Sequence, residues 1–216
     1  MPPLLGLWMA LAGMAPAAAA LSGTVAWDFK MVDWRGLYMP SAADPGAFDA
    51  IEVHQGIAIT PEAGPSLRDI FGATGQTRIE TDDEVAGKDY PGRDRIRIVT
   101  DVGGEARLEV DMVMERRDGS EMPTARARYT VPLVRFGNGW AAPIADSGPH
   151  FDAATRLQTG AIRGHLNAMG WRIKGLKSSH TLPPGEHALR LMPEAGGWRL
   201  ISVVPYTIRV AARLSK

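Results

Sequence analysis

Histidine and methionine side chains are the residues of this sequence that could bind a metal ion. The chain has 216 residues, with five histidines, ten methionines and no cysteine. Imidazole and thioether groups are soft ligands that suit copper(I). His165 and Met169 are four residues apart and would share one face of a helix, while His180 and His187 flank a Pro-Pro-Gly turn. These four residues make a periplasmic copper-binding carrier an alternative interpretation.

Close ligand pairs are missing from this sequence. It contains no His-x-His, His-x-Met or His-x-x-x-His spacing. Met112 and Met114 continue an apolar alternation, which is typical of core residues. We therefore expect no bound cofactor.

An acid, a hydroxyl and an imidazole occur together in the segment DSGPH, residues 146–150. A nucleophilic Ser147 would need His150 within hydrogen-bond reach and an acid behind the imidazole. The chain has no Gly-x-Ser-x-Gly elbow, and Asp-Ser-Gly-Pro is ordinary turn chemistry. A serine-type hydrolase is thus a second alternative. We assign no catalytic residue and favour a protein that is not an enzyme.

Aromatic side chains support a different hypothesis, which is a binding surface. Trp34 and Tyr38 lie among charged residues outside a clean alternation, and Trp140 follows the turn sequence Gly-Asn-Gly. Aromatic side chains exposed on loops are what protein-binding and sugar-binding surfaces use. These three residues are the candidates for contacting a partner. The sequence does not decide whether they are exposed, and the alternative is that they fill the core.

Most of the sequence alternates between apolar and polar residues, which predicts the strands that position these side chains. Pro and Gly fall between the apolar runs, as turns do in all-β proteins, and Gly103-Gly104 between two such runs predicts a hairpin. The predicted strands are residues 24–32, 51–59, 95–99, 106–114, 125–134, 188–192, 198–204 and 206–212.

Helices are expected at two places. Residues 65–71 could form two turns, and residues 151–169 are the longer candidate. In the longer segment, apolar residues recur at helical spacing, but Gly160 and Gly164 each weaken a helix by about 1 kcal/mol. We predict a short or broken helix there.

A repeated pattern of turns suggests an internal duplication. Pro91-Gly92 and Gly103-Gly104 bracket one alternating run, and Pro184-Gly185 and Gly196-Gly197 bracket another. The segment LPPGEHALRL, residues 182–191, is similar to a turn-and-strand pattern found in many immunoglobulin-like sandwiches. That resemblance implies a fold and no activity.

We therefore predict an all-β fold, an antiparallel β-sandwich with one or two short helices. Two tandem immunoglobulin-like sandwiches would occupy residues 21–119 and 120–216, since each half has a usual size for that fold. The alternative is a single β domain over residues 21–216.

The first twenty residues have the layout of a secretory signal peptide. The apolar run at residues 4–12 is shorter than the roughly 20 residues that span a bilayer. Four alanines at 17–20 would allow cleavage after Ala20, although no Lys or Arg precedes the run. A buried helix or a membrane anchor is the alternative. Without cysteine the chain has neither a lipidation site nor disulfides, which favours a bacterial periplasmic or secreted protein.

Charge balance restricts the partners. The chain has 24 Lys and Arg and 24 Asp and Glu. A neutral chain argues against nucleic acid, which requires a basic face, and against a polybasic membrane patch. We expect no stable membrane span after signal cleavage. The sequence thus predicts an exported binding or accessory protein of the bacterial cell envelope, with a protein or glycan as its partner.

Overall fold

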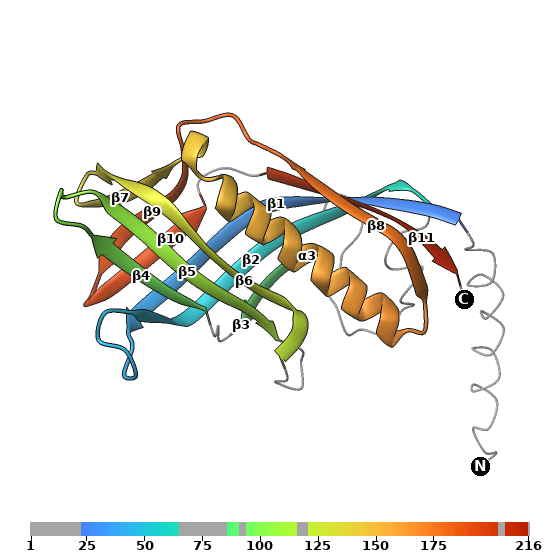
Figure 1. Cartoon of the computed structure of the whole chain (residues 1–216), viewed down its shortest axis with the longest axis horizontal. Coiled ribbons are helices and arrows are strands. Elements are labelled where there is room, and N and C mark those ends of the chain that lie inside the picture. The colour runs from blue at the N-terminus through green and yellow to red at the C-terminus, as the bar shows by residue number, and fades with distance from the viewer. Residues whose placement is uncertain (1–22, 65–85, 91–93, 116–120, 203–205, 216) are drawn as a thin grey trace, which may run out of the picture.

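The structure is a computed structural model of the chain, and it describes residues 23–64, 86–90, 94–115, 121–202 and 206–215 (Figure 1). Within these ranges, no helix has the length and apolar character needed to cross a membrane. The strands are β1 (Gly23–Pro40), β2 (Phe48–Ala63), β3 (Ala86–Tyr90), β4 (Arg95–Thr100), β5 (Ala106–Glu115), β6 (Glu121–Phe136), β7 (Gly139–Pro143), β8 (Arg172–Thr181), β9 (His187–Glu194), β10 (Gly197–Ser202) and β11 (Tyr206–Ser215). The helices are a 3₁₀ turn η2 (Ile144–Asp146) and α3 (Gly148–Ala168).

Eight of the strands form a closed antiparallel barrel. The strand order is β3-β2-β4-β5-β6-β7-β9-β10-β1-β11-β8, and an additional pairing of β1 with β2 closes the ring from β2 through β6 to β1. Outside the ring, β3 extends β2, while β11 and β8 continue the sheet from β1. Figure 1 shows the hairpin of β4 and β5 at one end of the molecule and the start of β1 beside the end of β11 at the other.

The all-β character is confirmed, but the predicted sandwich is wrong, both as one sandwich and as two in tandem. The reason is the length of β1 and β2, which have 18 and 16 residues and pair with each other almost throughout. Each then has residues left to pair on its other edge, β1 with β10 and β11 and β2 with β3 and β4. Closure of this kind pairs both sides of the eight strands of the ring, whereas a sandwich leaves free edges. The first and second halves of the chain both contribute strands to this barrel.

The predicted hairpin at Gly103-Gly104 is confirmed. β4 and β5 pair from Arg95 opposite Asp111 to Thr100 opposite Ala106. Gly104 adopts a φ of 80°, a region that favours glycine. The second bracketed run is also a hairpin, because β9 pairs with β10 around the turn before Gly197.

The long helix is continuous rather than short or broken. α3 has 21 residues and packs against β6 and β8 (Figure 1). Its inward side buries Phe151, Leu157, Ile162 and Leu166, each at 5% exposure or less. Burying such side chains contributes about 1.5–3 kcal/mol each, which outweighs the cost of two glycines at about 1 kcal/mol each. The other predicted helix, residues 65–71, lies outside the described residues.

Candidate functional site

The three aromatic candidates for a binding surface are buried. Trp34, Tyr38 and Trp140 are 4%, 0% and 8% exposed. They belong to the hydrophobic core, which was the alternative interpretation, so the structure does not support a binding surface at these positions. Their contact with a partner stays a prediction.

A β-bulge explains why Trp34 and Tyr38 face inward. The register with β2 shifts between Met31 and Asp33, so that Val32 is an extra residue in β1. Because side chains alternate along a strand, one extra residue moves the following side chains to the other face. Gly36 lies between the two aromatic residues, and a Cβ there would come within 2.5 Å of the Tyr38 ring. The glycine therefore makes room for that ring.

Trp140 is covered by an arginine. It pairs across the sheet with Arg135 on one side and with Leu191 on the other. The Arg135 guanidinium carbon lies 3.8 Å from the centroid of the indole ring. This cation–π contact leaves the arginine exposed and the tryptophan in the core.

The residues suggested for copper have separate surroundings. The His180 Nδ1 atom lies 3.1 Å from the Thr155 hydroxyl, and the His187 ring lies 5.0 Å from the Phe136 ring. Met169 is 44% exposed in the turn after α3. The side chain of His165 lies outside the described part of the structure. Among the described residues, no group of three or more His, Cys, Asp or Glu side chains is placed to hold a metal ion.

The hydroxyl of Ser147 has a structural partner. It donates to the Pro143 carbonyl oxygen at 2.5 Å, while the Ser147 carbonyl accepts from the backbone N–H groups of His150 and Phe151 at the start of α3. The His150 side chain instead contacts Tyr129, with 2.9 Å between Nδ1 and the phenol oxygen. The two side chains suggested for a hydrolase therefore bond to different partners.

His150 lies in an aromatic enclosure. It is 3% exposed, and its ring centroid is 5.2–6.3 Å from those of Trp34, Tyr129, Phe151 and Tyr206. Its Nε2 atom has no hydrogen-bond partner in the described part of the chain.

The surroundings of His150 keep its ring neutral. Burial, with a smaller effect from His180, lowers the pKa of His150 to about 4. Burial also raises the pKa of Tyr206 and that of Tyr129 well above their usual values. The enclosure is thus uncharged at neutral pH and packs α3 against the sheet.

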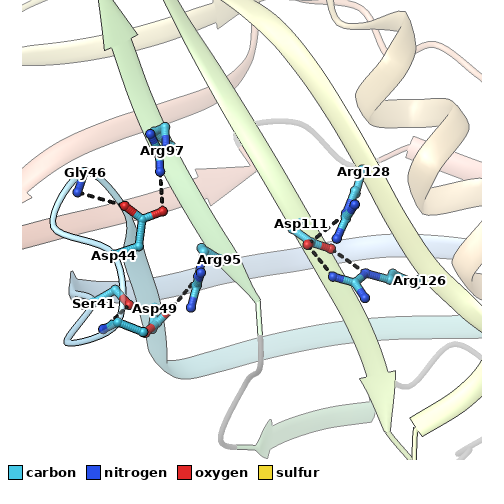
Figure 2. Close-up of polar contacts among 10 residues, drawn as sticks. Ser41, Asp44, Gly46, Asp49, Arg95, Arg97, Asp111, Arg126 and Arg128 are labelled. Atoms are coloured by element: carbon cyan, nitrogen blue, oxygen red, sulfur yellow. Dashed lines mark hydrogen bonds and ion pairs between the residues drawn. The ribbon is translucent and has the colours of Figure 1, made fainter.

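A charged groove lies on the outer face of the barrel. Figure 2 shows the arginines and aspartates that lie in and beside it. It has a volume of about 450 Å³, lies over β4, β5 and β6, and is bordered by Asp44 and Ala47 of the loop before β2. Its outward side chains include Arg95, Arg97, Glu109, Arg128 and Thr130.

Comparison with protein-family models, curated proteins and solved structures finds no match for the chain. The chemistry of the groove therefore has to be read from its own residues.

One row of alternating charges crosses four strands beside the groove. Asp49 of β2 lies opposite Arg95 of β4, which lies opposite Asp111 of β5, which lies opposite Arg128 of β6. Opposite charges facing each other across strands stabilise a sheet by about 0.2–1 kcal/mol per pair.

Three aspartates in this region, Asp111, Asp49 and Asp44, accept hydrogen bonds that lower their pKa values. Arg126 and then Arg128 lower the pKa of Asp111, at donor–acceptor distances of 2.6–2.9 Å. The Ser41 hydroxyl and then Arg95 lower the pKa of Asp49.

The third carboxylate, Asp44, is held by its own loop and by β4 (Figure 2). The Gly46 backbone N–H and then Arg97 lower its pKa. The carboxylates are therefore charged at neutral pH, and they fix the guanidinium groups in place.

Sequence reasoning missed this groove. The signal was present, because charged residues alternate as Arg95-x-Arg97, Glu109-x-Asp111 and Arg126-x-Arg128. Each pattern alone is typical of a solvated strand face. Only the register of β4, β5 and β6 brings the three patterns together.

Proposed function

We propose that this chain is an exported, non-enzymatic binding protein of the bacterial cell envelope that recognises a carboxylate-bearing protein or glycan through the groove over β4–β6. The N-terminal segment supports export, since an apolar run at residues 4–12 is followed by small residues up to Ala20. On this proposal the protein is periplasmic or secreted and begins at Leu21 after cleavage.

The observation that carries the proposal is the arrangement of three arginines on rigid strands. In the described part of the chain, Arg95 and Arg128 each use Nε, and Arg97 one terminal nitrogen, to bond a carboxylate. A guanidinium has five N–H donors in a planar fork, so each arginine keeps donors for a second acceptor. Carboxylates fit that fork with two parallel hydrogen bonds.

Preorganisation strengthens such recognition. Arg97 is anchored to Asp44 and Arg128 to Asp111 before any partner arrives. These long side chains are therefore already ordered in the free protein, so that binding a partner costs less conformational entropy and the affinity for that partner is higher. Thr130, which also lines the groove, adds a hydroxyl that can donate or accept.

Binding of a defined acidic glycan tests the glycan form of the proposal. We expect the protein to bind polygalacturonate and not neutral dextran in titration calorimetry. The Arg97→Gln/Arg128→Gln double variant should bind at least about tenfold more weakly, because two charge-assisted contacts are lost. The control Arg35→Gln/Arg209→Gln removes the same charge from two exposed ion pairs outside the groove and should bind as the wild type does.

Photo-crosslinking in cells tests the protein form. A benzophenone amino acid at position 130 should give defined cross-links to an envelope protein, and the same group at the exposed position 51 should not. These cross-links should disappear in the Arg97→Gln/Arg128→Gln background. The proposal would be contradicted if the protein showed no glycan binding and also no groove-specific cross-links. An uncleaved Met1 on protein recovered from the cytoplasm would contradict it as well.

A further inference from the structure

A second charged surface lies at the other end of the sheet, and its charges have one sign. We define the basic edge as Arg172, Lys174 and Lys177 of β8 together with Arg213 of β11. All four side chains are exposed. In the described part of the chain none of them forms an ion pair or hydrogen bond, whereas the arginines of the groove are all paired.

The register of β8 and β11 places these cations side by side. Lys174 lies directly opposite Arg213, with Arg172 opposite Ser215 and Lys177 opposite Ala211. Directly opposite side chains have Cβ atoms about 5 Å apart, and like charges at that spacing destabilise a sheet. Stability therefore does not account for this arrangement. On β4–β6 the same molecule places a carboxylate opposite Arg95 and Arg128.

Protection of a sheet edge accounts for only part of the pattern. β8 is the last strand of the sheet, and lysines on an edge strand discourage pairing with other chains. Arg213, however, lies on β11, which has β1 and β8 on its two sides. A cation on an inner strand, facing another cation, is not needed to protect an edge.

The place where β1 begins indicates which anion the basic edge meets. β1 begins at Gly23, opposite Leu214, and Thr24 lies opposite Arg213. Residues 1–22, with their apolar run at 4–12, therefore join the body next to the basic edge. Insertion of that run into a membrane before its cleavage would hold the basic edge close to lipid headgroups. Met169, 44% exposed three residues before Arg172, adds an apolar side chain near the same edge.

We propose that the basic edge is a docking surface for anionic phospholipid bilayers. Lipid phosphates would take the place of the missing carboxylates beside Lys174 and Arg213. A cluster of four cations binds an anionic surface reversibly, and each cation strengthens binding about fivefold at low salt. This surface is separate from the groove over β4–β6, so either can be present without the other.

Vesicle co-sedimentation with the purified full chain tests the proposal. The wild type should bind vesicles containing 30% phosphatidylglycerol more strongly than pure phosphatidylcholine vesicles, and the difference should shrink as salt rises from 50 to 300 mM. The Lys174→Gln/Lys177→Gln variant should weaken the anionic component by roughly 20-fold. All variants share the same N-terminal segment, so its own insertion cancels in the comparison.

Two further variants keep the test independent of folding. The control Arg35→Gln/Arg107→Gln loses the same charge elsewhere and should bind as the wild type does. Lys174→Glu also changes the charge by two units and should weaken the anionic component by at least roughly 20-fold, while raising the melting temperature, because it places a carboxylate opposite Arg213. Loss of binding in a more stable variant cannot result from unfolding.

Three outcomes would overturn the proposal. One is equal binding of the wild type and Lys174→Gln/Lys177→Gln to the anionic vesicles. Another is binding to a 30-base-pair DNA duplex as tight as binding to vesicles, which would make the edge a general polyanion or nucleic-acid surface. The third is displacement from vesicles by 10 mM inorganic phosphate beyond the effect of equal ionic strength, which would indicate a discrete phosphate site.

Discussion

Single residues in this protein gain their roles from the environment and not from their sequence neighbours. Ser147 and His150 are three positions apart, yet one bonds the backbone before α3 and the other bonds Tyr129 of β6. Sequence showed the proximity of the two residues, and it could not show that the chain turns into a helix between them. Burial then makes His150 a neutral packing residue.

Stability should fall when the pH drops from 7 to 4.5. The pKa of His150 is about 4 in the folded protein and near 6.5 when unfolded, so the unfolded chain binds the proton first and its protonation favours unfolding. The free energy of unfolding should therefore be about 2–3 kcal/mol lower at pH 4.5 than at pH 7. Urea unfolding followed by tryptophan fluorescence would measure it.

The variant His150→Phe supplies the control for this pH effect. It should be less stable at pH 7, since the bond to Tyr129 is lost, but nearly insensitive to pH between 6.5 and 4.5. Asp44, Asp49 and Asp111 have lowered pKa values, so their contributions are lost only as the pH falls below about 3.8. An equal pH slope in wild type and variant would rule out His150 as the cause.

Gly36→Ala should destabilise the barrel by about 1–3 kcal/mol, because the new methyl group overlaps a buried ring. Its Cβ would lie 2.5 Å from the Tyr38 ring, which is fully buried. Gly148→Ala, with nothing within 4 Å of its Cβ, is the matched control and should change stability little. Thermal unfolding of the two variants would decide, and equal melting temperatures would contradict the packing around Tyr38.

At the scale of elements, the alternation of apolar and polar residues located most strands. It did not predict correctly, along the whole of each strand, which side chains face the core. Residues 24–31 alternate as predicted, and the bulge at Val32 then reverses the phase for Trp34 and Tyr38. Another shift, between Leu37 and Tyr38, leaves Ile51 of β2 without a partner in β1 and 56% exposed, although it shares the alternation of the buried Val53. Bulges arise from long-range pairing, which a local pattern does not encode.

Charge-reversing substitutions in the two charged regions should change the free energy of unfolding in opposite directions. Lys174→Glu should raise the free energy of unfolding by about 0.2–1 kcal/mol, because it faces Arg213. Asp111→Lys should lower that free energy by a similar or larger amount, because it faces both Arg95 and Arg128. Chemical denaturation at low and high salt would measure both effects, which should shrink with salt. A destabilised Lys174→Glu variant would contradict the like-charge pairing on β8 and β11.

At the scale of the whole molecule, net charge concealed the arrangement of charge. Equal numbers of acids and bases led to the expectation of no polybasic patch, yet the paired charges gather over β4–β6 and unpaired cations gather on β8 and β11. The sequence also did not show that the sheet closes into a barrel. Closure depends on β1 pairing with β2 on one edge and with β10 and β11 on the other. A local pattern shows that strands exist, and their partners decide between sandwich and barrel.

β1 connects the ring to its extension, and its amide protons should therefore exchange slowly. One of its edges pairs with β2, and the other pairs with β11 over Gly23–Met31 and with β10 over Arg35–Tyr38. Among the described strands β8 pairs with β11 alone, and it also contacts α3. We expect peptides from β1 to exchange at least about tenfold more slowly than peptides from β8 in hydrogen-exchange mass spectrometry, because their opening requires opening of the barrel.

Peptides from β9, an inner strand between β7 and β10, provide the comparison within the ring. They should exchange as slowly as β1, because both strands are bonded on two edges and open only with the barrel. If β8 were as protected as β1 and β9, the barrel and its extension would unfold as one unit. The strands that carry the basic edge would then have no separate freedom to adjust to a membrane surface.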